Sequence, residues 1–155
     1  MFHIVLVEPE IPPNTGNIAR TCAATGVFLH LVKPLGFSLD EKRVKRAGLD
    51  YWPYVNLTIH ESLEAFLDEH KDDSLYFATT KSSRNYTEVS YEPGCYILFG
   101  KETKGLPESL IKSNSERAIR IPMGNSEKLR SLNLSNAAAV VLYEAFRQHD
   151  FTGLY

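Results

Sequence analysis

Short apolar runs alternate with amphipathic segments along the chain. Five runs of four to six mostly apolar residues predict strands, at residues 2–7, 28–32, 75–78, 95–99 and 118–121. Helical patterns cover Asn14–Thr25, Glu61–Glu69, Pro107–Lys112 and Ser135–Gln148. Continuous apolar strands separated by helices are typical of a parallel sheet that is covered on both faces. The pattern therefore predicts an α/β fold with a mostly parallel sheet flanked by helices.

Composition agrees with one globular domain spanning residues 1–155. Of the 155 residues, 43% are hydrophobic and 23% are charged, which is ordinary for such a domain. No apolar run approaches the roughly 18 residues of a membrane span, and the first residues resemble a strand and not a signal peptide. Cys22 and Cys95 lie in apolar stretches, which predicts reduced core thiols in a cytoplasmic protein.

Charge and histidine content narrow the classes of partner. The five histidines and two cysteines show no ligand spacing, so we expect no metal and interpret the histidines as structural. The net charge of −2 does not suggest a protein that coats nucleic acid through an overall basic surface. A local basic patch nevertheless occurs at Lys42–Arg46. Taken alone, this patch is best interpreted as a solvated helix face.

The candidate chemistry lies in the segments that follow three predicted strands. These segments are rich in glycine or hydroxyl groups and comprise Thr79–Ser82, Gly100–Gly105 and Pro122–Ser126. Ligands of open parallel sheets bind beyond the carboxyl ends of the strands, so we expect the three segments to line one pocket.

The start of the last helix adds a fourth wall. Ser131, Asn133, Ser135 and Asn136 crowd this start, where one capping side chain would suffice. The surplus polar groups indicate either a ligand site or a doubly capped helix with a polar loop, and this segment alone does not decide between them.

The common nucleotide and hydrolase motifs are absent. No GxGxxG follows the first strand, and neither a phosphate-binding GxxxxGK[ST] loop nor a GxSxG nucleophile turn occurs. The loops offer mainly Asn, Ser, Thr and Arg, with one Glu. These groups suit the orientation of an activated cofactor and a hydroxyl substrate better than hydrolysis.

Three segments, in order and at the right separations, resemble the motifs of the SPOUT methyltransferases in their SpoU branch, which methylates RNA 2′-O-ribose. They are Pro13–Cys22, Leu98–Leu106, and Ile121–Met123 followed by Ser131–Ala137. Val7–Asn14 and Arg46–Tyr51 are further similar to the compact subfamily that methylates the ribose of the wobble cytidine or uridine in leucine tRNAs.

The resemblance implies a SPOUT fold with a deep C-terminal trefoil knot, a homodimer, and S-adenosylmethionine bound in the knot. Carried over by motif, the cofactor contacts fall on Ala78, Thr79, Gly100, Glu102, Ile121, Ser131 and Leu132. The catalytic positions fall on Arg20, Ser131 and Asn133, while Asn14 and Glu102 would hold them in place. Arg20, Lys42, Arg43 and Arg46 are the candidate tRNA contacts.

Other interpretations remain open for the single residues and for the whole chain. Asn14 could cap its helix, Arg20 could form a surface ion pair, and Glu102 could cap the helix at Pro107. The substrate could be ribosomal RNA or another tRNA position. A non-catalytic RNA-binding or assembly factor, or a small-molecule-binding protein unrelated to RNA, would use the same fold differently.

Overall fold

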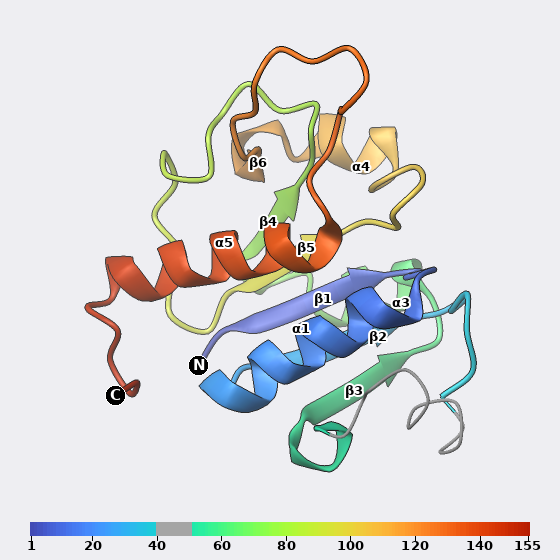
Figure 1. Ribbon diagram of the computed structural model, residues 1–155, viewed down its shortest axis with the longest axis vertical. Coiled ribbons are helices and arrows are strands. Elements are labelled where there is room, and N and C mark those ends of the chain that lie inside the picture. The colour runs from blue at the N-terminus through green and yellow to red at the C-terminus, as the bar shows by residue number, and fades with distance from the viewer. Residues whose placement is uncertain (40–50) are drawn as a thin grey trace.

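The computed structural model describes residues 1–39 and 51–155 and contains one six-stranded sheet (Figure 1). The strands are β1 (His3–Val7), β2 (Phe28–Val32), β3 (Asn56–His60), β4 (Leu75–Ala78), β5 (Tyr96–Phe99) and β6 (Ala118–Ile119). Their order is β3-β2-β1-β5-β4-β6, and every neighbouring pair is parallel. The chain builds one half of the sheet outward from β1 through β2 to β3 and then crosses to β4; β5 fills the place between β4 and β1, and β6 adds outside β4. The two halves therefore meet between β1 and β5, which creates a switch point there.

Helices cover both faces of the sheet. The long helices α1 (Pro12–Thr25) and α5 (Leu134–Gln148) pack side by side on one face, as Figure 1 shows, over a core that includes Ile4 and Leu6 of β1. The short helices α3 (Leu63–Glu69) and α4 (Glu108–Ser113) cover the other face, where Val5 and Val7 point. Because successive residues of β1 face opposite cores, both sets must be apolar, and this produces the continuous apolar run.

The predicted fold class is confirmed, with differences at element ends. The helix expected from Asn14 begins at Pro12, because a proline in the first turn has a helix-compatible φ and lacks only an N–H that would be unpaired there. The helix expected from Glu61 begins at Leu63, since the Ser62 hydroxyl accepts a hydrogen bond from Ala65 N and caps the start. The last expected strand ends at Ile119 instead of Ile121.

One strand was missed, and some predictions lie outside the described residues. β3 carries polar residues at Asn56 and Thr58, and it lies at the edge of the sheet, where three of its five residues are exposed. Lys42, Arg43 and Arg46 fall in the undescribed segment 40–50, so their assignment as tRNA contacts stays a prediction from sequence. Within the described ranges, no helix combines the length and apolar character needed to cross a bilayer.

Both cysteines are buried and free, as expected. Burial raises the pKa of Cys22 and of Cys95 to about 12, so both thiols stay protonated at neutral pH.

The loop after β5 folds back on itself at Gly100. The Gly105 amide donates to the Lys101 carbonyl at 2.8 Å, and Gly105 has a φ of +69°. A Cβ atom on Gly100 would lie 2.1 Å from the carbonyl carbon of Gly105 and 2.1 Å from the amide nitrogen of Leu106. Backbone therefore occupies the space of a side chain at this position, and only glycine fits.

Replacing Gly100 by alanine should therefore open this loop. We expect Gly100→Ala to lower the free energy of unfolding by at least about 2 kcal/mol, since backbone and not a flexible side chain must move. Urea denaturation measures the change. Gly124→Ala is the matched control, because nothing lies within 4 Å of a Cβ atom there. Equal stability of the two variants would contradict the close approach at Gly100.

Candidate functional site

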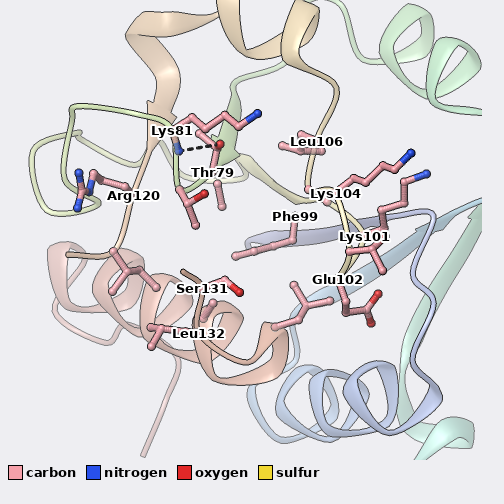
Figure 2. A pocket seen from close by; sticks show the side chains of 18 of the residues that line it. Thr79, Lys81, Phe99, Lys101, Glu102, Lys104, Leu106, Arg120, Ser131 and Leu132 are labelled. Atoms are coloured by element: carbon pink, nitrogen blue, oxygen red, sulfur yellow. Dashed lines mark hydrogen bonds between the residues drawn. The ribbon is translucent and has the colours of Figure 1, made fainter. Parts of the chain in front are cut away.

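A pocket of about 940 Å³ lies beyond the carboxyl ends of four neighbouring strands (Figure 2). Glu8 follows β1, Thr79 follows β4, Gly100 follows β5 and Arg120 follows β6, and all four residues line the pocket. Residues 130–134, at the start of α5, form another wall. The four predicted walls therefore surround one space, although the loop after β6 contributes Met123 and not Gly124–Ser126.

Glu102 ties the loop after β5 to the start of α1. Its carboxylate accepts hydrogen bonds from the backbone amides of Glu10 at 2.8 Å and Ile11 at 3.1 Å, and from Asn14 Nδ2 at 3.3 Å. Ile11 is the N-cap position of α1 and provides no capping side chain. The carboxylate of Glu102 thus provides, from 91 residues away, the negative group that a helix start favours.

A second contact, from Glu10 to the loop after β5, joins the same two segments. Its Oε1 accepts from the Thr103 hydroxyl at 2.7 Å and from the Thr103 amide at 3.2 Å. These hydrogen bonds stabilise the charged carboxylate and lower the pKa of Glu10. The loop after β1 and the loop after β5 are therefore joined in both directions at the switch point of the sheet.

Asn14 and Asn133 extend the connection to α5. Asn14 is buried, and its Oδ1 accepts from Asn133 Nδ2 at 2.9 Å. Asn133 is the N-cap of α5, where its Oδ1 accepts from the amides of Ser135 at 2.9 Å and Asn136 at 3.3 Å and from the Ser135 hydroxyl. One line of side chains, Glu102–Asn14–Asn133, thus joins three segments that are distant in sequence; we call it the Glu102–Asn14–Asn133 chain.

The Glu102–Asn14–Asn133 chain decides between the alternatives that the sequence left open for Asn14 and for Glu102. The Asn14 side chain does not cap its own helix but links Glu102 to Asn133. Glu102 bonds to the start of α1, so the alternative that it caps the helix at Pro107 is wrong. At the start of α5, Asn133 performs the capping, and Ser131 is left as a hydroxyl on the pocket wall.

The seven residues assigned to the cofactor all line the same pocket. Figure 2 shows Ser131 and Leu132 on the side nearest α5, with Thr79 across from them. Ser131 and Asn133, two of the three assigned catalytic residues, also belong to the lining.

Arg20 does not line the pocket, unlike the other assigned residues that the structure describes. It is exposed on α1, six residues beyond Asn14 and so about 9 Å farther along the helix axis. Its guanidinium carbon lies 4.9 Å from the centre of the Tyr51 ring, a cation–π contact. The structure thus places Arg20 outside the group of residues that it brings together.

Cations gather around the mouth of the pocket, and sequence reasoning did not assign them to the site. Lys81, Lys101, Lys104 and Arg120 all belong to the lining, and Figure 2 shows them around the opening. Lys101 Nζ lies 3.9 Å from a Glu8 oxygen, and Lys81 pairs with Glu108, which lowers the pKa of the Glu108 carboxyl. The sequence could have indicated the three lysines, because each lies in a segment that follows a predicted strand. Cations of the lining outnumber its carboxylates even after these two pairs, which suits an anionic substrate.

Apolar side chains form the rest of the contact surface beside these polar groups. Phe99, Leu106, Ile121, Leu132 and Leu134 surround the space between the polar ends. An apolar pocket with a few placed polar groups is typical of a site for a medium-sized organic molecule.

Comparisons with known proteins agree with this geometry. A model described as the SpoU rRNA Methylase family matches residues 1–143. The tRNA (cytidine(34)-2′-O)-methyltransferase of Methylovorus glucosotrophus strain SIP3-4 is 53% identical over 154 residues, which cover 99% of this chain and 99% of the relative.

Solved structures give the same result. A structure described as giving insights into the 2-OH methylation of C/U34 on tRNA is 44% identical, with a TM-score of 0.89 over 97% of each chain. An AdoMet-bound rRNA methyltransferase from Sinorhizobium meliloti is 25% identical, with a TM-score of 0.79 over 94% of this chain and 56% of its own. The parallel sheet, the pocket at its switch point and these matches over nearly the full chain show that the protein belongs to the SpoU rRNA methylase family.

Proposed function

We propose that this protein is a tRNA methyltransferase that moves a methyl group from S-adenosylmethionine to the ribose 2′-hydroxyl of the wobble pyrimidine, nucleotide 34. The observation that carries the proposal is the pocket at the strand ends, in a chain that is 53% identical over nearly its full length to a relative named as a cytidine-34 methyltransferase. The choice of leucine tRNAs is a finer part of the proposal and rests on segments 7–14 and 46–51. Location in the cytoplasm is part of the same proposal and is supported only by the choice of a tRNA substrate.

The pocket fits S-adenosylmethionine in size and chemistry. Its volume of about 940 Å³ lies within the usual range for cofactor sites. Apolar side chains such as Leu106 and Leu132 suit the adenine ring, and the loop that folds back at Gly100 forms one wall of the pocket. Residues Ala78, Thr79, Gly100, Glu102, Ile121, Ser131 and Leu132 form the proposed cofactor site.

S-adenosylmethionine, when bound, supplies a methyl group on a positively charged sulfur. The protein then needs to align the ribose hydroxyl and to stabilise the negative charge that develops on its oxygen. Ser131 and Asn133 are placed to orient the ribose from the pocket wall, and Asn14 and Glu102 fix Asn133. Arg20 stays protonated, so its role is to bind the neighbouring phosphate or to stabilise charge, and not to remove the proton.

The proposal includes a homodimer in which Arg20 of one copy serves the pocket of the other. Two observations support this part: Arg20 lies outside the pocket of its own chain, and α5, which packs beside α1, exposes the apolar side chains of Val140 and Tyr143, the latter to 46%. The proposed C-terminal knot is supported by the route of the chain, which leaves the edge strand β6 through residues 120–133 and returns as α5 beside α1 (Figure 1).

The direct test is methyl transfer from labelled S-adenosylmethionine to bulk tRNA from a strain that lacks this gene. Mass spectrometry then identifies the modified nucleoside and its position. We expect a 2′-O-methylated pyrimidine at nucleotide 34. Transfer only to ribosomal RNA, or to another tRNA position, would overturn the substrate assignment, and cofactor binding without any transfer would favour a binding factor.

Arg20→Ala separates catalysis from binding in the same assay. We expect a loss of turnover of about 100-fold or more with unchanged cofactor affinity, as for other lost electrostatic groups. Lys71→Ala, which removes an exposed cation after α3, is the control and should keep full turnover.

Mixing the inactive Arg20→Ala and Asn133→Ala proteins tests the shared site. If Arg20 acts across the dimer, mixed dimers contain one intact site and recover part of the activity. If Arg20 acts within its own chain, mixing recovers nothing.

The basic segment supplies a separate prediction. Neutralising Lys42, Arg43 and Arg46 together should weaken tRNA binding and flatten its salt dependence, because each phosphate contact adds about one unit to the slope. Binding measured over a series of salt concentrations checks this. An unchanged affinity and slope would remove the segment from the tRNA interface.

A further inference from the structure

Three histidines from neighbouring strands form a hydrogen-bonded line across the sheet. His3 Nδ1 lies 2.9 Å from His30 Nε2, and His30 Nδ1 lies 2.9 Å from His60 Nε2. The register places the three on one face, because His30 lies two positions beyond the partner of His3 and His60 lies two beyond the partner of His30. The line ends at the last residue of the edge strand β3 (Figure 1).

Two more ligand-type side chains meet the line at His60. Glu69 ends α3 and His70 is its C-cap residue. One ligand atom from each of His60, Glu69 and His70 lies within 4.8 Å of the other two. The side chains of His60 and His70 are only 6% and 11% exposed, whereas that of Glu69 is 64% exposed. The cluster thus has one buried imidazole, one that is largely buried, and one carboxylate that faces solvent.

The second nitrogen of His70 is free to act as a ligand. His70 Nδ1 lies 2.7 Å from Asp73 Oδ2, and this contact places the ring proton on Nδ1. His70 Nε2 is then a bare acceptor, and it is buried with no hydrogen-bond partner in the described part of the chain. A buried acceptor without a partner is costly. A carboxylate behind a histidine is the usual support of a metal-binding imidazole.

His60 also has one ring nitrogen that is hydrogen-bonded and one that could bind a metal ion. Its Nε2 already hydrogen-bonds to His30, and its other nitrogen, Nδ1, lies 3.6 Å from a Glu69 oxygen. If the protons of the line lie on Nε2 of His60 and of His30, each ring donates to the next, and His60 Nδ1 presents a lone pair. Both imidazoles therefore have one nitrogen held by a supporting partner and one nitrogen available.

We propose that His60, Glu69 and His70 bind a divalent transition-metal ion, of which zinc fits best. Two imidazoles and one carboxylate are a usual zinc donor set, with water in the fourth position, whereas magnesium and calcium prefer oxygen donors alone. None of the three residues lines the pocket, so the ion lies apart from the proposed methyltransferase site. It joins the end of the edge strand β3 to the end of α3.

The aromatic surroundings favour such a site. The His70 ring lies 4.5 Å from the centres of the Phe66 and Tyr96 rings, and the Phe66 side chain is fully buried. These rings limit the access of water on the buried side and strengthen electrostatic attraction there. This proposal departs from the sequence-based expectation of no metal, which arose because the ligands come from a strand end and a helix end and show no recognised spacing.

The test is titration of tag-free, chelator-dialysed protein with Zn²⁺ in a calorimeter, together with the melting temperature. We expect one ion per chain and a higher melting temperature with zinc. Glu69→Gln should weaken binding by about 10-fold or more and His70→Gln should abolish it, while Asp73→Asn, which alters only the support of His70, should weaken it about 10- to 100-fold. The Co²⁺ complex should show no thiolate charge-transfer absorption.

Glu64→Gln is the matched control, because it removes an exposed carboxylate from the first turn of the same helix. It should bind zinc as the wild type does. Circular dichroism establishes that each variant is folded, and Asp73→Asn keeps the test decisive if His70→Gln does not fold. The proposal is overturned if the wild type shows no saturable zinc binding at micromolar concentration, if Glu69→Gln and Asp73→Asn bind as tightly as the wild type, or if cobalt reports a cysteine ligand.

Discussion

The Glu102–Asn14–Asn133 chain is the interaction on which the candidate site depends. It joins the loop after β5, the start of α1 and the start of α5, and no sequence-local contact would hold these three segments together. Glu102 accepts hydrogen bonds from backbone amides at the start of α1, and Asn133 accepts them from backbone amides at the start of α5. Asn14 links these two side chains. Because Asn14 is buried, removing any member leaves polar groups without partners, so the chain is expected to act as a unit.

The sheet provides the rigid base for this chain. The parallel strands β1, β4, β5 and β6 end at one edge, and the switch between β1 and β5 separates the loops that form the pocket. The reciprocal contacts of Glu10 and Glu102 bridge that switch. The polar groups thus come from loops and helix starts, whereas their relative positions are fixed by strands packed between two apolar cores.

The sequence predicted the sheet and the pocket walls because both follow local patterns. Apolar runs identify buried strands, and hydroxyl- or glycine-rich segments after them identify the ligand edge. The edge strand β3 was not predicted, because Asn56 and Thr58 interrupt the apolar pattern in a strand that is partly exposed to solvent. The resemblance implied that Asn14 and Glu102 hold the catalytic residues, but the hydrogen bonds of Glu102 with the amides of Glu10 and Ile11 were not predicted, because no local spacing indicates a pairing over 91 to 92 residues. Likewise, His60 and His70 become neighbours only when α3 packs against the sheet.

A double-mutant cycle on S-adenosylmethionine affinity tests most directly whether the Glu102–Asn14–Asn133 chain organises the pocket. Calorimetry would compare the wild type, Asn14→Ala, Asn133→Ala and the double variant. Since the two side chains bond directly at 2.9 Å, the double variant should lose little more affinity than either single variant, with a coupling energy of about 0.5 to 3 kcal/mol. Losses that add to within about 0.5 kcal/mol would contradict the account, because the two residues would then act independently.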